Sequence, residues 1–237
     1  MEGTTWQAWN PSIYTILATV IEFMDRQDLP YVVEPMRVQD IGEVVEIELV
    51  SFTSPWPPRA YRYEVRQNRL AHYFVARRRS PEAPEEEAEE RDSGLLQWMQ
   101  HWTHSTRTRR TSVVGYCGFW IAGDEAHIST IAVDPEYRRR GVGQLLLVTA
   151  IERAIQLNAR LMSLEVRVSN ITAQSLYHKY GFKVVGSQPR YYSDNREDAL
   201  IMTAEHILSA PYQRLLQKRR KQLVQRLRPV PIAASQE

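Results

Sequence analysis

Residues 129–147, STIAVDPEYRRRGVGQLLL, combine charge and glycine in a way that suits anion binding. An apolar, strand-like run ends at Val133, and Gly141 and Gly143 then lead into an apolar helical run. Between them stand three consecutive arginines, Arg138, Arg139 and Arg140. The first N–H groups of a helix point beyond its N-terminus, glycine lets a ligand approach the backbone, and arginine pairs with phosphate. The stretch predicts a phosphate-binding turn; the alternative is a surface turn with solvated arginines.

The spacing of this turn excludes two common phosphate motifs. No Gly-Lys-Ser/Thr follows, so the turn is not a P-loop, and the third glycine of the dinucleotide fingerprint is missing after Gly143.

The six histidines show no metal-ligand spacing, and Cys117 lies inside an apolar run as an inert core thiol would. We therefore predict no metal site.

Glu165 is an acidic residue inside an otherwise apolar strand, LMSLEVRVS. Strand alternation places Leu164 and Val166 on one face and Glu165 and Arg167 on the other. Carboxylates are seldom buried in sheets unless they are paired. Glu165 is therefore either one half of an ion pair, with Arg167 or with a neighbouring strand, or a general base.

Residues 170–182, NITAQSLYHKYGF, contain an aromatic stripe on a short helix. Tyr177 shares a face with Ala173, Leu176 and Tyr180, and by spacing alone such a stripe is more often core than catalytic. Gly181 is placed to end the helix.

The elements that must position these residues follow the order β-α-α-β-β-β-α-β-α-β-β, which predicts an α/β fold with a sheet of mixed direction. Strands are expected at 31–37, 70–78, 112–123, 126–133 and 161–169, with a hairpin at 184–203. Helices are expected at 38–52, where Ile41, Val44, Val45 and Leu49 should face inward, and within 54–68, 143–159 and 170–180.

Three segments fall outside this pattern and divide the chain into a domain at 31–206 with additions. Residues 1–30 hold an amphipathic helical extension, 80–112 an acidic insert with a short helix that we expect to be flexible, and 207–237 a basic C-terminal tail. In the C-terminal tail, leucines fall on one helical face. The tail is therefore either a solvated helix whose leucine face caps the core, or a tether to ribosomal RNA.

Composition limits the location of the protein. The net charge is only +2, so any basic surface is local, and a single cysteine allows no intramolecular disulfide, which fits a reducing compartment. The apolar run at 13–24 is shorter than the ~20 residues that span a bilayer. We expect a cytoplasmic protein with no membrane partner.

The phosphate turn, Arg138-x-x-Gly141-x-Gly143 after a strand ending in Val-Asp-Pro, resembles the pyrophosphate-binding motif of the GNAT superfamily of N-acetyltransferases, in which the anion is coenzyme A. Residues 164–182 resemble the second signature of that superfamily. Residues 190–202, RYYSDNREDALIM, and 52–61, FTSPWPPRAY, resemble the ribosomal-protein-alanine N-acetyltransferases (the RimI group) and their N-terminal acetyltransferase relatives. The resemblance covers roughly residues 31–204. It implies a mixed, mostly antiparallel central sheet with helices on both faces and a splayed pair of parallel strands.

The resemblance also implies roles in acetyl transfer. Glu165 would be a general base acting through water, and only modest base help is needed because a peptide α-amino group has a pKa of about 8. Tyr177 would protonate the departing thiolate, since a thiol pKa of ~8.5 and a phenol pKa of about 10 differ little. The N–H of Val133 would stabilise the oxyanion. Cofactor contacts would come from Ile131, Ala132, Val133, Arg138, Arg139, Arg140, Gly141, Val142, Gly143, Gln144 and Asn170, the last of these also a helix N-cap.

Three aromatic residues match positions that line the acceptor groove of the family: Trp56, Tyr191 and Tyr192. The alternative is that Trp56 packs a loop and one of the tyrosines belongs to the core. The acidic insert should emerge at the carboxyl end of the fourth strand, near the cofactor entrance.

The sequence thus predicts an acyltransferase with acetyl-CoA as co-substrate that acetylates a protein N-terminal α-amino group by direct transfer in a ternary complex, with the N-terminal alanine of a ribosomal protein as the expected acceptor. A lysine side chain or a small amine is the alternative acceptor. An alternative of another class is a non-catalytic acetyl-CoA-binding or ribosome- or RNA-associated module.

Overall fold

The computed structural model of this 237-residue chain describes residues 29–79 and 112–228. Apart from residues at their edges, the predicted N-terminal helical extension and the acidic insert lie outside the described residues, as do the final residues of the basic tail, 229–237.

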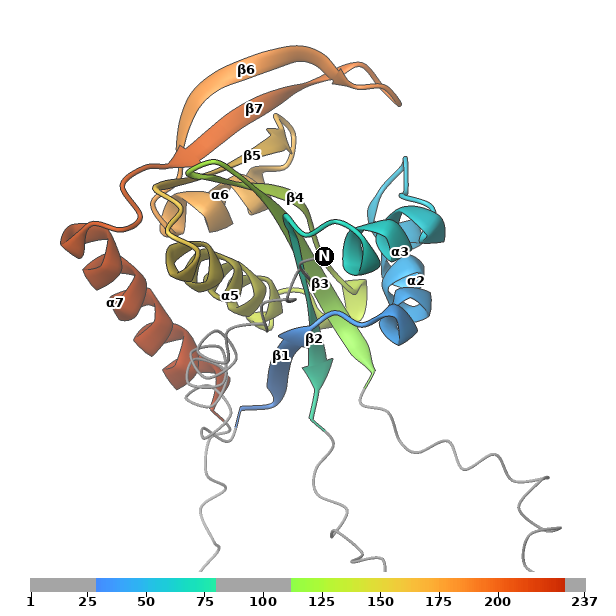
Figure 1. Cartoon of the computed structure of the whole chain (residues 1–237), viewed down its shortest axis with the longest axis horizontal. Coiled ribbons are helices and arrows are strands. Elements are labelled where there is room, and N and C mark those ends of the chain that lie inside the picture. The colour runs from blue at the N-terminus through green and yellow to red at the C-terminus, as the bar shows by residue number, and fades with distance from the viewer. Residues whose placement is uncertain (1–28, 80–111, 229–237) are drawn as a thin grey trace, which may run out of the picture.

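In the residues that the structure describes, a seven-stranded sheet forms the centre of the fold, in the order β1-β2-β3-β4-β5-β7-β6 (Figure 1). Among these seven strands only β4 and β5 run parallel, and every other neighbouring pair is antiparallel, which confirms the predicted mixed sheet. The strands are β1 (Tyr31–Pro35), β2 (Ala71–Arg78), β3 (Val113–Ala122), β4 (Glu125–Val133), β5 (Leu161–Arg167), β6 (Lys183–Tyr192) and β7 (Glu197–Ala204).

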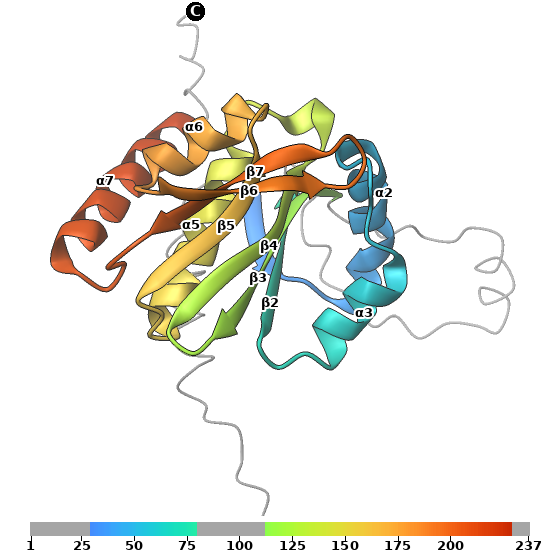
Figure 2. The same ribbon diagram turned by 90° about the horizontal axis from the view of Figure 1, so that it is seen from above.

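Helices cover both faces of the sheet (Figures 1 and 2). The helices α5, α6 and α7 pack on one face, and α2 and α3 pack on the other, each group with its own apolar cluster. Their bounds are α2 (Ile41–Ser51), α3 (Pro58–Arg66), α5 (Val142–Gln156), α6 (Ile171–Lys179) and α7 (Ala210–Leu227), with short 3₁₀ turns η1 (Val38–Asp40) and η2 (Pro135–Tyr137).

The helix α2 corrects one detail of the sequence prediction. Ile41 and Val44 are buried as expected, but Leu49 is 61% exposed, so its predicted inward orientation is wrong. At 100° per residue, the direction set by Ile41 and Val44 continues to Ile47 and Glu48, while Leu49 falls on the far flank. Glu48 therefore occupies a buried position that the apolar pattern did not indicate.

The parallel pair β4–β5 separates along its length. Pairing joins Glu125–Ile128 of β4 to Leu161–Leu164 of β5 and extends no further. At the same point Gly118 pairs with Thr130 and Phe119 with Ile128, so one residue of β4 is unpaired in a β-bulge that bends the strand. The carboxyl-terminal half of β4 therefore has β3 on one side and an opening on the other.

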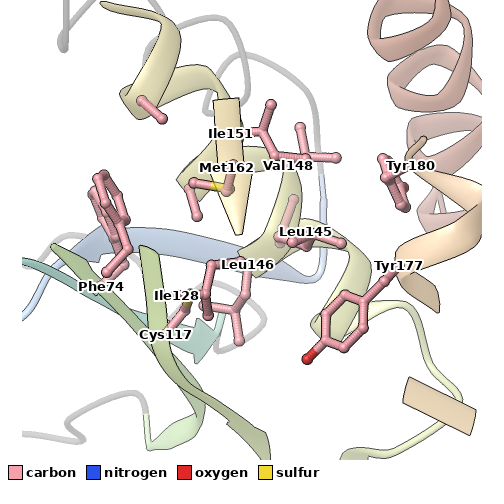
Figure 3. Close-up of a cluster of buried hydrophobic side chains, with 14 of the residues drawn as sticks. Phe74, Cys117, Ile128, Leu145, Leu146, Val148, Ile151, Met162, Tyr177 and Tyr180 are labelled. Carbon is pink, nitrogen blue, oxygen red and sulfur yellow. The ribbon is translucent and has the colours of Figure 1, made fainter. Parts of the chain in front are cut away.

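The core beneath this opening is built mainly by α5, which packs against β2, β3 and β4. Leu145, Leu146 and Ile151 are fully buried, and Figure 3 shows them gathered with Met162 of β5. Cys117 is buried in the same cluster, which confirms the core thiol predicted from the sequence, and its burial raises the pKa of the thiol to about 12.

The described part of the predicted tail is the helix α7, and it belongs to the same core. It buries Tyr212, Leu216, Leu223, Val224 and Leu227 in the α5 cluster. The leucine face thus caps the core, as one of the two interpretations of the tail expected. The division of the chain after residue 206 remains a prediction, and the packing of α7 gives no boundary there.

Candidate functional site

The predicted phosphate turn joins η2 to α5 and adopts the conformation that an anion site requires. Arg139 (φ 63°) and Gly141 (φ 93°) are both left-handed, and Gly141 is the N-cap of α5 without a side-chain cap. Within the part of the chain that the structure describes, the amides of Val142, Gly143 and Gln144 donate to no acceptor. Three adjacent N–H donors at a helix N-terminus therefore remain available to a phosphate.

The three arginines of the turn do not all point to the same place. Arg138 donates from Nε to the carbonyl of Val133 at 3.0 Å and from Nη2 to Ser51 Oγ at 3.2 Å, so it braces the end of β4. The guanidinium of Arg140 lies over the ring of Tyr137, 5.3 Å from its centroid. The cofactor contacts predicted for these side chains stay predictions, and Arg138 has a structural role that the sequence did not reveal.

Next to the turn, residues Ile131, Ala132 and Val133 line the opening between β4 and β5. They pair with Cys117, Tyr116 and Gly115 of β3 and have no partner on β5. Because alternate residues of a strand direct their N–H and C=O groups to opposite sides, part of this backbone faces the opening unpaired. Such an edge can pair with an extended amide-containing ligand.

Glu165 lies beyond the last β4–β5 pair, on the sheet face opposite to Leu164 and Val166, as the alternation predicted. Its carboxylate is partly buried, with the side chain 22% exposed, and Oε2 lies 3.1 Å from Nε2 of His127 on β4. Glu165 is therefore paired with a neighbouring strand, as the sequence allowed, through His127 and not through Arg167, and the contact is an ion pair when the imidazole is protonated. Arg167 pairs instead with Asp194 and Glu197.

His127 was not identified from the sequence, and it connects Glu165 to a polar chain. Its Nδ1 lies 2.9 Å from Ser163 Oγ, which in turn donates to Glu125 Oε1. With the serine hydroxyl donating to Glu125, its oxygen is free to accept from Nδ1–H, and Glu165 accepts from Nε2–H. The carboxylate of Glu165 raises the pKa of His127, against the opposing effect of burial. The signal available in the sequence was the alternation of Glu125, His127 and Ser129 in a strand beside β5.

Tyr177 is only 5% exposed and packs in the α5 cluster, with its ring 5.8 Å from that of Phe182. Figure 3 shows the side chain extending from α6 toward the central strands. Burial raises the pKa of the hydroxyl, and among the described residues the hydroxyl has no hydrogen-bond partner. The tyrosine is thus a core residue, and its hydroxyl is a protonated group whose predicted catalytic role stays a prediction. Asn170 is the N-cap of α6, and its side chain accepts from the amide of Ala173.

Aromatic side chains line the site beside Glu165. Trp56 stacks on Trp120 with centroids 6.3 Å apart, and Trp120 stacks on His127 at 6.2 Å. The loop that carries Trp56 is held by buried Glu48, which accepts from the Trp56 amide and from the Tyr61 hydroxyl. Trp56 therefore packs its loop and also borders the site, so the two interpretations of this residue are compatible.

The two tyrosines of the β6–β7 hairpin have different environments. Tyr191 is 45% exposed and stands edge-on to Tyr192, while Tyr192 lies beneath the guanidinium of Arg167 at 3.8 Å. Burial is the main cause that raises the pKa of both phenols, and the charge of Glu165 acts in the same direction. Tyr191 is the accessible member of the pair, and Tyr192 supports it.

An ionic tie fixes the hairpin to the far side of the site. Arg167 contacts Asp194 at 2.9 Å and Glu197 at 3.1 Å, and Asp194 accepts from Thr53 in the loop after α2. Figure 2 shows the hairpin reaching across the sheet toward α2. The hairpin and the α2–α3 loop therefore frame the same space above Glu165.

These features agree with comparisons to known proteins. The sequence profile of the acetyltransferase (GNAT) family matches residues 41–182. The chain belongs to this family, whose members are acyltransferases that use acetyl-CoA.

Relatives with specific names narrow the comparison. A protein of Bacillus subtilis named, provisionally, as a ribosomal protein bS18-alanine N-acetyltransferase is 41% identical over 170 residues, which cover 72% of this chain and 92% of that protein. An N-alpha-acetyltransferase of Sulfurisphaera tokodaii is 29% identical over 175 residues, covering 73% and 92% of the two chains. The crystal structure of the ribosomal-protein-alanine N-acetyltransferase from Escherichia coli superimposes with a TM-score of 0.55 at 24% identity, covering 74% of this chain and 94% of that one, which supports the fold.

Within the described parts of the chain, no helix is long and apolar enough to cross a membrane. No group of histidine, cysteine or acidic side chains there is arranged to hold a metal ion.

Proposed function

We propose that this protein is an acetyl-CoA-dependent N-acetyltransferase that acts on a protein N-terminal α-amino group, with the N-terminal alanine of a ribosomal protein as its acceptor. The observation that carries the proposal is the position of Glu165. A carboxylate lies at the splayed end of the β4–β5 pair, with unpaired β4 backbone beside it and an aromatic wall around it. The names of the similar Bacillus and Sulfurisphaera proteins favour the N-terminal amine as acceptor.

The residues of the turn and of β4 fit coenzyme A. The free amides of Val142, Gly143 and Gln144 suit a pyrophosphate, and the part of the Ile131–Val133 backbone that faces the opening without a partner suits the amide groups of a pantetheine arm. A Cβ at Gly143 would make only ordinary van der Waals contacts with Val133 and Leu176, so the packing of the protein does not require a glycine at this position. The space left by the missing side chain is instead available to the ligand. Bound acetyl-CoA would supply the thioester that is the acetyl donor.

Glu165 takes a proton from the acceptor ammonium, directly or through one water, and the resulting free amine is the nucleophile that attacks the thioester carbonyl. A free α-amino group has a pKa of about 8, so a modest base suffices near neutral pH. His127 holds the carboxylate from the β4 side, and Ser163 and Glu125 hold the imidazole. The carboxylate therefore keeps a fixed orientation while it remains open to the acceptor side of the sheet.

Tyr177 supplies the proton for the leaving group. Burial keeps its hydroxyl protonated, because burial raises the pKa of the phenol. Tyr177 belongs to the apolar cluster on the α5 and α6 side of the sheet, while Glu165 faces the other side. Base and acid thus approach the reacting atoms from two faces, which suits direct transfer in a ternary complex.

The acceptor peptide lies between the α2–α3 loop and the β6–β7 hairpin, where Trp56, Tyr191 and Tyr192 are its walls. Tyr191 is exposed enough to contact a peptide. A lysine side chain or small amine would need the same base, so the acceptor must be established by assay. A non-catalytic module is disfavoured, because an ordered His127–Glu165 pair at the cofactor opening has no evident use in binding alone.

Ribosomal RNA contact and a cytoplasmic location are further parts of this proposal. The outer face of α7 carries the exposed cations Arg214 and Lys218, and the helix contains no acidic residue. Because the inner face of α7 belongs to the core, removal of the tail would damage the fold, and charge substitutions on the outer face are the better test. Replacement of both cations by glutamine should weaken salt-sensitive RNA binding; an unchanged affinity would exclude the contact.

A peptide assay tests the acceptor directly. Three peptides of one ribosomal-protein sequence are compared: a free N-terminal alanine without lysine, the same with the N-terminus blocked, and the blocked form with an internal lysine. Mass spectrometry should find acetylation of the first peptide only. Acetylation of the lysine peptide would favour the alternative acceptor, and no acetylation of any peptide despite acetyl-CoA binding would favour the non-catalytic module.

A further inference from the structure

The C-terminal half of α7 is in direct contact with the phosphate turn. Arg226 donates from Nη2 to the carbonyl of Arg139 at 2.9 Å. Leu227 and Leu223 pack against Gly141 so closely that a Cβ there would lie 2.9 Å from Leu227 Cδ2 and 3.3 Å from Leu223 Cδ1. The helix therefore touches both left-handed residues of the turn.

These contacts act where the backbone needs outside support. Arg139 carries a side chain at φ 63°, a conformation that residues other than glycine adopt only when their surroundings hold them there. The guanidinium of Arg226 fixes the orientation of the peptide group that follows Arg139. That orientation sets the direction of the amides that follow in the first turn of α5.

α7 is also linked, through the end of α6, to Gln144 in the first turn of α5. Arg219 donates from Nε to the carbonyl of Lys179 at 3.2 Å, at the last residue of α6. The ammonium of Lys179 in turn donates to the side-chain carbonyl of Gln144, which also accepts from the Tyr180 hydroxyl. α7 therefore contacts the phosphate turn directly. It also holds the end of α6, where Lys179 contacts Gln144.

The same contacts gather positive charge without an acidic partner. Among the described residues, no carboxylate forms an ion pair with Arg139, Lys179, Arg219 or Arg226. Arg219 and Arg226 act, after burial, to lower the pKa of Lys179, so these cations repel one another. A bound phosphate would relieve that repulsion.

We infer that α7 is a positioning element of the cofactor site: Arg226, with Leu223 and Leu227 behind it, holds the turn in the conformation that binds the phosphates of acetyl-CoA. The inference rests on the proposed function. The family profile ends at residue 182, so the whole of α7 lies beyond the part of the chain that the profile describes. The strands β6 and β7 lie beyond the profile as well, and α7 is the element among these that contacts the phosphate turn.

The full-length variants Arg226→Gln and Lys221→Gln test the inference as a matched pair. Both remove one positive charge from α7, but Lys221 is exposed and makes no contact with the turn. Calorimetry with acetyl-CoA should show affinity weakened about tenfold in Arg226→Gln, as expected for loss of one charge-assisted hydrogen bond. Lys221→Gln should bind as the wild type does, and Arg226→Lys should recover part of the affinity.

Kinetics and stability separate positioning from a general structural role. Arg226→Gln should raise KM for acetyl-CoA with kcat, the peptide KM and Tm close to those of Lys221→Gln. Equal acetyl-CoA affinity in the two variants, or a fall in Tm with parallel loss of cofactor and peptide binding, would overturn the inference. Calorimetry needs no acceptor, so a wild-type protein that binds acetyl-CoA without acetylating peptide would contradict the proposed function and leave this test intact.

Discussion

At the scale of single residues, the acceptor chemistry depends on the pair Glu165 and His127. The two side chains come from different strands and meet at 3.1 Å, just where the strands separate. In this placement one edge of the Glu165 carboxylate faces the His127 ring, and the other edge faces the side of the sheet where the acceptor binds. Each residue of the pair can be tested by its own measurement.

Glu165→Gln keeps the shape of the side chain and removes its charge. We expect kcat to fall by about 10²–10⁴, the usual effect of losing a general base, with little change in acetyl-CoA affinity. The deficit should shrink as the pH rises, because the acceptor amine then deprotonates without help. A variant with near-normal turnover at neutral pH would remove Glu165 from the mechanism.

The same substitution should change the titration of His127. The carboxylate is the main cause that raises the pKa of His127, while burial acts in the opposite direction. Removing the carboxylate leaves burial dominant, so in Glu165→Gln the imidazole should lose its proton at a lower pH than in the wild type. NMR of the ring protons measures this; an unchanged or higher pKa would mean that the pair is not formed in solution.

At the scale of elements, the phosphate turn and the β6–β7 hairpin are separate units with separate ligands. The turn is shaped by left-handed residues and by α7. The hairpin is fixed by Arg167 and its two carboxylates. Changes in the first should affect the cofactor, and changes in the second should affect the acceptor.

Two glycine substitutions in the turn should affect different properties, cofactor binding in one variant and stability in the other. In Gly143→Glu, the new Cβ has room beside Val133 and Leu176, so the fold should survive while the added carboxylate abolishes acetyl-CoA binding. In Gly141→Ala, the φ of 93° and the contact with Leu227 should lower Tm. Calorimetry and thermal unfolding of both variants check this, and undiminished cofactor binding by Gly143→Glu would show that the turn is not the cofactor site.

The hairpin tie should govern the acceptor. Arg167 and Thr53 hold the pKa of Asp194 down at about 2, so the carboxylate stays charged and the tie persists at any pH used for assay. Because this pKa is lowered, the tie is lost only as the pH falls through that value. Asp194→Asn should raise the peptide KM and leave the acetyl-CoA affinity unchanged. A change in acetyl-CoA affinity instead would contradict the separation of the two units.

At the scale of the whole molecule, local patterns predicted most of the fold. The strand and helix order and the glycine turn follow from apolar periodicity and from short motifs, the splayed pair was implied by the family resemblance, and the structure has them all. The sequence did not reveal contacts that depend on how distant elements meet. His127 reaches Glu165 only through the β4–β5 register, Arg138 turns back to Val133, and α7 returns to Gly141 across 80 or so intervening residues.

The central claim is that this protein acetylates the N-terminal amine of a ribosomal protein. The most direct measurement is mass spectrometry of protein N-termini from cells that carry the wild-type enzyme, the Glu165→Gln variant or no enzyme. The account predicts that acetylation of an N-terminal alanine on a ribosomal protein is present with the wild-type enzyme and lost in the other two. N-termini that are identical in all three samples, with acetylated lysines or small amines differing instead, would contradict it.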